Sequence, residues 1–263
     1  SSDGLFDIIK MKQTREGDLS PDQNVFMQEC EQMKSLCDTI KKNCKDIIDA
    51  IDGKLTMDER IENLIFSLSF GRVPAKWISD GFATNRGLAS WLKSLIARIE
   101  QLKQFESNDN VCPKVVFINR LFNPLSYLTA VRQLAARKLD QELDKLDILT
   151  EPSNYYLKDN EPKGVVFKES QGVPIYGLHL QGCRFDEDNK VLEESRPKES
   201  FFVLPIIFCK VMSVEFLDPK KDLKNSYICP MYKTIDRQST FVCFAQFRTK
   251  APPAKWTIAG VAV

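Results

Sequence analysis

Residues 22–51 read DQNVFMQECEQMKSLCDTIKKNCKDIIDAI, and this stretch carries the clearest structural signal of the 263-residue chain. Its apolar residues recur in alternating steps of four and three, the spacing of a helix in left-handed, coiled-coil-like packing. Pro21 and Asp22 suit the start of this helix, and Gly53 suits its end. The repeating apolar positions are Phe26, Cys30, Met33, Cys37, Ile40, Cys44, Ile47 and Ile51.

Two arrangements satisfy this heptad pattern, a dimeric coiled coil and an antiparallel hairpin of helices within one chain. The pattern stops after roughly four heptads and further helical segments follow directly, so we favour the hairpin. Thr56 and Glu59 have the spacing of a capping box, which predicts a second helix that ends near Phe70 and Gly71. Val73 precedes a proline and so disfavours helical backbone.

Two further helices are expected before residue 150. An apolar stripe with helical spacing predicts one helix over residues 86–105. Asn123 and Pro124 then match the N-cap and first position of a helix that runs to about Leu139. Lys114 to Ile118 has the composition of a short buried strand, and the acidic residues at 140–147 fit a solvated helix end.

The second half of the sequence is a series of short β-rich runs separated by turn residues. About six short strands at this spacing predict a small antiparallel β-barrel, which removes exposed strand edges. The expected class is therefore α+β, with an N-terminal extension (1–21), a helical subdomain (22–150), a linker (151–163) and a β-barrel subdomain (164–263). The expected strands are Val165–Lys168, Ile175–Gln181, Phe201–Phe208, Tyr227–Tyr232, Thr240–Phe247 and Trp256–Val261.

Composition excludes several classes of protein. The 37 basic residues nearly balance the 36 acidic ones, which argues against a nucleic-acid binder. No apolar run approaches the ~20 residues that a membrane-spanning helix needs, and the N-terminus lacks a signal-peptide pattern. The eight cysteines form no C-x-x-C pair and there is one histidine, so we expect free thiols in a reducing, cytoplasmic compartment and no metal site.

The sequence also lacks recognisable catalytic motifs. It has no phosphate-binding loop, no dinucleotide-binding glycine pattern and no G-x-S-x-G, so we predict no catalytic, cofactor-binding or metal-binding residues and no cofactor. The least improbable enzyme would pair His179 with Cys183. Asp186 to Asn189 is interpreted as a hairpin turn, because it lacks the twelve-residue loop of an EF-hand.

A small-ligand-binding barrel remains an alternative function. Aromatic side chains of the expected strands could line a cavity in such a barrel, although they suit an ordinary filled core better. These residues are Phe201, Phe202, Phe208, Phe241 and Phe244.

An ordered set of motifs resembles the C-terminal domain of dynein heavy chains over about residues 24–263. Gly71-Arg72-Val73-Pro74 through Trp77 is similar to the family's G-R-V-P-x-x-W, and Leu88 through Trp91 to the L-x-x-W that follows. The other matching segments are Phe122-Asn123-Pro124, Leu128 to Val131, Ala136-Arg137, Tyr176 to Leu178, Leu180, Gly182, Phe185-Asp186, Leu192 to Ser195, Pro197-Lys198, Tyr227 to Thr234, Pro252-Pro253, Trp256 and Gly260 to Ala262.

The resemblance implies a helical segment and a six-stranded barrel packed on the AAA+ ring of the motor, where the domain tunes force and processivity. It implies that ring modules of the same heavy chain are the direct partners, and that the parent motor ATPase binds microtubules and dynein subunits. Similarity to axonemal types implies a cytoskeletal location in the axoneme of a cilium or flagellum. The isolated fragment is expected to be monomeric.

Three positions depart from the family pattern. Asn119-Arg120-Leu121 replaces S-G-F, and Phe185 replaces a tryptophan. The loop between Arg237 and Phe241 is shorter than in many relatives, which puts any contact made by that loop in doubt.

Overall fold

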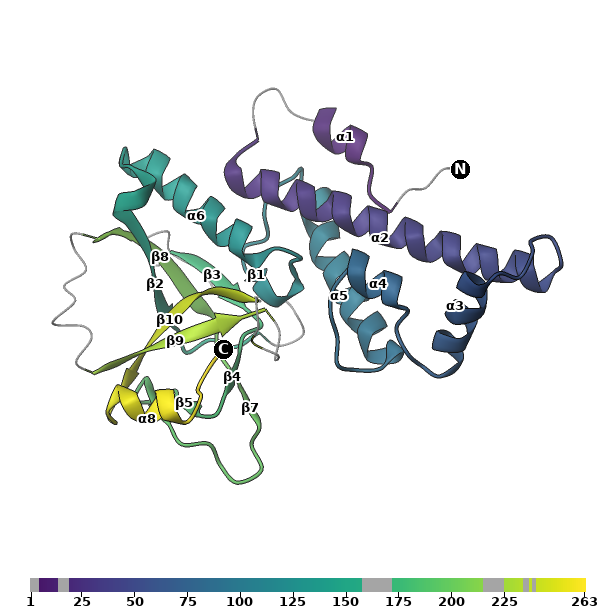
Figure 1. Cartoon of the computed structure of the whole chain (residues 1–263). Helices are drawn as coiled ribbons and strands as arrows, with labels where there is room; N and C mark the ends of the chain where they lie inside the picture. The colour runs from purple at the N-terminus through teal and green to yellow at the C-terminus, as the bar shows by residue number, and fades with distance from the viewer. Residues whose placement is uncertain (1–4, 14–18, 158–171, 215–224, 234–236, 238–239) are drawn as a thin grey trace. The chain divides into compact units, whose positions relative to one another are not determined.

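The computed structural model describes residues 5–13, 19–157, 172–214, 225–233, 237 and 240–263, and these form two compact units (Figure 1). The first unit ends at Cys112 and the second begins at Pro113. The linker expected at 151–163 stays a prediction, and its residues from 158 onward lie outside the described part.

The first unit is helical. Its helices are α1 (Ile8–Gln13), α2 (Pro21–Ile51), α3 (Glu59–Ser69), α4 (Ala75–Asp80) and α5 (Leu88–Ser107). The long helix α2 contacts α3, α4 and α5 of the same molecule, which agrees with the hairpin interpretation of the heptad pattern. The short helix α4 was not expected.

The heptad pattern describes only the first half of α2. Phe26, Cys30 and Met33 are fully buried, and the Phe26 ring lies 5.2 Å from that of Phe105 in α5. Further along, Cys44 and Ile51 are exposed. The residues buried there are Leu36, Asn43 and Ala50. A straight helix rotates by about 20° per heptad relative to a 3.5-residue repeat. The line of buried side chains along α2 therefore shifts to a neighbouring row of residues.

Helix α3 begins two residues later than expected. Its N-cap is Asp58, whose Oδ1 accepts a hydrogen bond of 2.8 Å from the backbone N–H of Ile61. The capping box predicted at Thr56 is therefore wrong, because the aspartate satisfies one of the free N–H groups of the first turn.

This cap supports a direct test. Asp58→Ala should lower the free energy of unfolding by about 0.5–2 kcal/mol, because the N–H of Ile61 loses its acceptor. The measurement is urea denaturation followed by circular dichroism. Thr56→Ala is the matched control and should leave the unfolding midpoint unchanged; equal effects of the two substitutions would contradict the assignment of the cap.

The second unit packs helices on three small sheets. The first sheet has the order β1 (Val116–Phe117), β3 (Val173–Tyr176), β8 (Ile207–Ser213), β2 (Leu146–Pro152). The second has the order β5 (Arg184–Asp186), β6 (Val191–Glu193), β10 (Phe241–Thr249), β9 (Ser226–Tyr232), and the third pairs β4 (His179–Gln181) with β7 (Phe201–Val203). Helix α6 (Pro124–Leu139) contacts β2, β8 and β10, and helix α8 (Pro253–Ile258) contacts β9. Two 3-10 turns among the described residues cover Ile118–Arg120 and Leu143–Lys145.

The expected six-stranded antiparallel barrel is wrong. The three sheets are separate, and two pairs of strands, β1 with β3 and β6 with β10, run parallel. The strands β2 and β10 contact each other, but the bond between them is the backbone N–H of Gln246 to Thr150 Oγ1 at 2.7 Å. Because a side chain and not a ladder joins them, the sheet does not close at this point.

Side chains occupy the outer edge of β2. Arg132 Nη2 donates hydrogen bonds to the carbonyls of Leu143 and Leu146 at 3.0 and 2.9 Å. The backbone N–H of Ile148 donates to Asp147 Oδ1 at 2.7 Å. An edge whose polar groups are already satisfied has less to gain from pairing with another strand, which is one physical reason that the barrel stays open.

Residues 261–263 connect the second and third sheets. Ala262 exchanges two backbone hydrogen bonds with Gln181 of β4, at 2.8 and 3.3 Å. Val263 accepts from Tyr232 N–H at 2.7 Å and donates to the Pro230 carbonyl at 3.0 Å, both in β9. Pro230 has no N–H, which is compatible with its place on an edge strand.

Several expected strands differ from those observed. The segment 256–261 is not a strand: α8 covers Pro253–Ile258, since Pro253 at its first position is preorganised for a helix. The run Ile175–Gln181 divides into β3 and β4 at Gly177, whose φ of 88° is left-handed. The run Phe201–Phe208 divides into β7 and β8. Strand β2 was missed, and Val165–Lys168 lies outside the described residues.

Two further expectations agree with the structure. Helix α6 begins at Pro124 with Asn123 as its cap, and Asn123 Oδ1 accepts from Ser126 N–H at 3.3 Å. Asp186 closes the turn between β5 and β6, accepting from the backbone N–H of Asp188 and of Asn189. This confirms the hairpin turn.

Candidate interaction surfaces

His179 and Cys183 do not form a reactive pair. His179 lies exposed on β4, whereas the Cys183 side chain is 1% exposed. Burial raises the pKa of the Cys183 thiol to about 12, so the thiol stays protonated at neutral pH. Because the thiolate is the nucleophile, this environment suits a packing role.

All eight cysteines lie among the described residues and are free thiols. Burial also raises the pKa of Cys30, Cys209 and Cys229 above the ordinary range. Cys44 is the exposed member of the set.

Thiol labelling should follow this burial. An aromatic disulfide reagent at pH 8 should modify Cys44 rapidly and should modify Cys183, Cys209 and Cys229 only in denaturant, since buried thiols offer neither access nor thiolate. Peptide mapping by mass spectrometry assigns each site. Cys44→Ser should remove the rapid reaction at that site, and rapid labelling of Cys183 in the folded protein would refute the packing role.

The five aromatic residues considered as a ligand-binding lining do not all line one cavity, although Phe241 and Phe244 share the groove described below. Phe208 is buried in a small core cluster with Val115 and Ile206. By contrast, Phe201, Phe241 and Phe244 are 43%, 44% and 57% exposed. The described strands do not form the barrel that the ligand-binding alternative needs.

The described residues contain no cluster of three His, Cys, Asp or Glu side chains that could hold a metal ion. Likewise, no helix in the described part combines the length and apolar character needed to cross a bilayer.

Several large apolar side chains are exposed on α2, on α3 and in the connection between these two helices. Phe66 and Phe70 are 55% and 64% exposed, and their rings lie 4.6 Å apart. The end of α2 and the α2–α3 connection add further exposed side chains. We call this the α2–α3 surface; its residues are Ile48, Ile51, Leu55, Met57, Phe66 and Phe70.

An ion pair joins these two helices beside the surface. Arg60 Nη2 of α3 lies 2.9 Å from Asp46 Oδ2 of α2, and the Asp46 side chain is 17% exposed. Because the Arg60 side chain is 51% exposed, solvent screens this pair, and its contribution to stability is small.

The second unit has an apolar groove of about 230 Å³ between α6, β2 and β10. Phe244 and Leu125, 57% and 49% exposed, stand among the side chains that line it. We call it the β2–β10 groove; its residues are Leu125, Leu128, Thr129, Arg132, Asp147, Ile148, Phe241, Val242, Cys243 and Phe244.

A β-bulge places the two phenylalanines of the groove on the same side of β10. The register shifts between Phe241 and Cys243, so Val242 is an extra residue. Regular alternation would turn Phe241 inward, but the bulge exposes it and buries Val242. The rings of Phe241 and Phe244 consequently lie 4.9 Å apart.

Burial raises the pKa of Cys243 in this groove to about 11, and the nearby Asp147 carboxylate adds to the effect. The thiol is therefore neutral at physiological pH. A neutral, half-buried thiol gives the groove apolar lining rather than a nucleophile.

Sequence reasoning identified neither surface as such, although it named Phe241 and Phe244 among side chains that could line a cavity. Phe66 and Phe70 lie four residues apart and off the stripe of Ile61 and Leu64, which are buried. That spacing was a readable signal for an exposed aromatic pair. The β2–β10 groove had no such signal, because it depends on a missed strand and on a bulge.

Comparison with known proteins identifies the relatives of this protein. Residues 2–263 match the sequence family described as the C-terminal domain of the dynein heavy chain. The ciliary dynein beta chain of Heliocidaris crassispina is 35% identical over 246 residues, which is 94% of this sequence. Human dynein axonemal heavy chain 17 is 34% identical over 91% of the sequence, and the flagellar outer arm beta chain of Chlamydomonas reinhardtii is 35% identical over 98%. The 263 residues span only 5–6% of the length of these relatives.

Proposed function

Because this chain belongs to the dynein heavy chain family as its C-terminal domain, we propose that it is a non-catalytic module packed on the AAA+ ring of its own heavy chain. In this position it modulates the force and processivity of the motor. The relatives' heavy chains are far longer, so ATP hydrolysis and microtubule binding are assigned to other parts of the parent protein, together with binding of other dynein subunits.

We place the parent motor in the axoneme of a cilium or flagellum. The relatives are named as ciliary, axonemal and flagellar dynein chains, and each covers most of this sequence in alignment. This is a cytoskeletal location, and it matches the motor role proposed above.

The proposal that the domain packs on the AAA+ ring rests on the exposed α2–α3 surface. Large exposed apolar residues that cluster on one surface mark sites of protein contact. Phe66 and Phe70 together present two aromatic rings to solvent on adjacent turns of α3. Aromatic side chains are enriched at the centres of interfaces, where they contribute most of the binding energy.

A pair of substitutions that introduce negative charge tests the proposed packing on the ring. Phe66→Asp with Phe70→Asp in the parent heavy chain should weaken packing on the ring, because desolvating two carboxylates opposes contact. Stall force and run length in a single-molecule optical trap should both change. Ile258→Asp is the control, since that side chain is 87% exposed on α8 and belongs to neither surface.

The same assay tests whether the domain modulates the motor or only packs on the ring. Deleting residues 152–263 from the heavy chain provides a larger perturbation in the same assay. If stall force and run length match the unmodified motor in both the double variant and the deletion, the proposed modulation is wrong.

A further inference from the structure

The β2–β10 groove lies between two strands whose facing edges form no backbone ladder with each other. Within the described residues, β10 pairs with β9 and, at Arg248 and Thr249, with β6, whereas β2 pairs with β8. The part of β10 that lines the groove, Phe241 to Phe244, precedes the β6 pairing. Among the described strands, one side of this segment is therefore outside any ladder.

The backbone of Phe244 faces this open side. Phe244 lies opposite Pro230, and the Pro230 carbonyl bonds Val263 on the other side of β9. The two residues thus form a non-hydrogen-bonded pair, in which both backbones point away from each other. Gln246, two residues along, has the same orientation, and its N–H reaches Thr150 of β2.

The groove also offers side-chain contacts on both sides of that open segment. The bulge brings the rings of Phe241 and Phe244 together on one side, and Leu125 of α6 stands across the groove. Arg132 also lines the groove.

The geometry points to an extended, apolar peptide segment that adds to β10 at Phe244 and places an apolar side chain between Phe244 and Leu125. An extended peptide matches an open strand edge because it supplies backbone donors and acceptors together with alternating side chains.

The segment belongs to the part of the same heavy chain outside these 263 residues, an assignment that rests on the proposed function. The domain spans 5% of its relatives' length, so most of the heavy chain is available to supply the segment. A segment in the same molecule binds at a high effective concentration. A groove of about 230 Å³ would bind a free peptide weakly, but a segment of the same molecule can occupy it.

Photocrosslinking in the full heavy chain tests the assignment. A benzophenone amino acid replaces Phe244 in one variant and Leu125 in a second, and mass spectrometry identifies the products. Both probes should react with one common segment of the same heavy chain. A probe at Ile258, which is exposed on α8, should not reach that segment.

A second set of variants in the cross-linking experiment places a charge in the β2–β10 groove. Phe241→Asp should reduce the Leu125 cross-link by about tenfold, which corresponds to 1.4 kcal/mol of lost affinity. Cys44→Asp, a change at an exposed position in the helical unit, should leave the yield unchanged. If the probes at Phe244 and Leu125 give no product, react with different segments, or react only with other polypeptides, the assignment is wrong.

Ring packing is read out separately in the same experiment. A probe at Phe66 on the α2–α3 surface should cross-link to ring modules whether or not the groove is occupied. Loss of the Phe244 product with retention of the Phe66 product overturns the groove assignment alone, and loss of the Phe66 product overturns the proposed packing of the α2–α3 surface.

Discussion

Trp91→Ala is expected to lower the free energy of unfolding of the helical unit by about 3–5 kcal/mol. Trp91 is 1% exposed and is stacked against Trp77 and Phe82, with ring centroids 6.0 and 4.9 Å away. Its Nε1–H donates to the Phe82 carbonyl at 3.2 Å. The substitution therefore creates a cavity and removes a buried hydrogen bond at the same time.

The measurement is equilibrium unfolding in guanidinium chloride, followed by tryptophan fluorescence and circular dichroism. Leu92→Ala is the matched control, because Leu92 is the next residue of α5 and is 38% exposed. The control should cost well under half as much as Trp91→Ala. Equal losses at the two positions would show that the aromatic stack is not the main support of α5.

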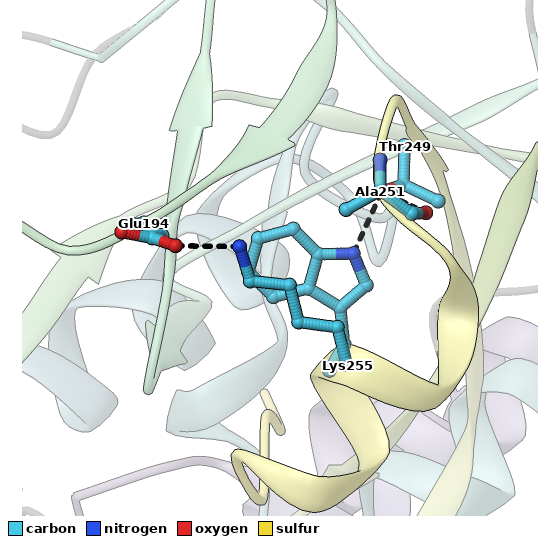
Figure 2. Close-up of polar contacts among 5 residues, drawn as sticks. Glu194, Thr249, Ala251 and Lys255 are labelled. Carbon is cyan, nitrogen blue, oxygen red and sulfur yellow. Dashed lines mark hydrogen bonds and ion pairs between the residues drawn. The ribbon is translucent and has the colours of Figure 1, made fainter.

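Trp256→Ala is expected to destabilise the C-terminal unit by a similar amount, about 3–5 kcal/mol. Trp256 of α8 is 3% exposed, and its Nε1–H donates to Thr249 Oγ1 at 2.6 Å (Figure 2). The same hydroxyl donates to the Ala251 carbonyl and accepts from the Ala251 N–H. The tryptophan thus anchors the turn that leads from β10 into α8.

Ile258→Ala is the control for this position, since Ile258 lies two residues further along α8 and is 87% exposed. Thr249→Val removes the hydroxyl while keeping the shape, and should cost less than Trp256→Ala. Unfolding monitored by near-ultraviolet circular dichroism distinguishes these cases. A Trp256→Ala protein as stable as the Ile258→Ala protein would contradict the anchoring role.

A second contact on α8 should contribute little. Lys255 lies over the Trp256 ring, 5.3 Å from its centroid, and its Nζ bonds the Glu194 carboxylate (Figure 2). The hydrogen bond from Lys255 lowers the pKa of the Glu194 carboxyl. Since both groups are exposed, solvent screens the pair, and its contribution to stability is small compared with burial of the tryptophan.

Helices were predictable from sequence because their signals are local. The extents of α2 and α6 follow from proline at the first position and from apolar spacing along one face. The cap of α3 was misplaced because Thr56 and Asp58 are both good N-cap residues, and spacing alone does not choose between them. The short α4 has too few residues for a helical period to be visible.

The sheets were less predictable because pairing is not local. Strand β2 alternates exposed and buried residues, but it follows the acidic residues after α6 and was interpreted as part of the helical half. Short strands predicted a closed barrel, whereas closure also depends on which edges carry side-chain caps such as Arg132 and Asp147. The bonds from Arg132 of α6 reach Leu143 and Leu146, and the sequence does not show such contacts between elements.

The same division applies to the two surfaces. Family membership was recognisable from ordered motifs, and the aromatic pair Phe66 and Phe70 could have been found from its spacing. The β2–β10 groove could not, because it requires the bulge at Val242 and the relative placement of three elements.

The wide separation of paired strands in the second unit has a consequence for how it folds. The bond between Thr150 and Gln246 joins residues 96 positions apart, and the ladders between β2 and β8 and between β6 and β10 also span long stretches of sequence. Contacts between residues distant in sequence form slowly, because the entropic cost of closing a large loop comes before the contacts can stabilise the fold. During synthesis, β6 must therefore wait for its ladder with β10, and Thr150 for its bond with Gln246, until residues 241–249 have emerged. Strand edges that stay unpaired in that interval are open to aggregation.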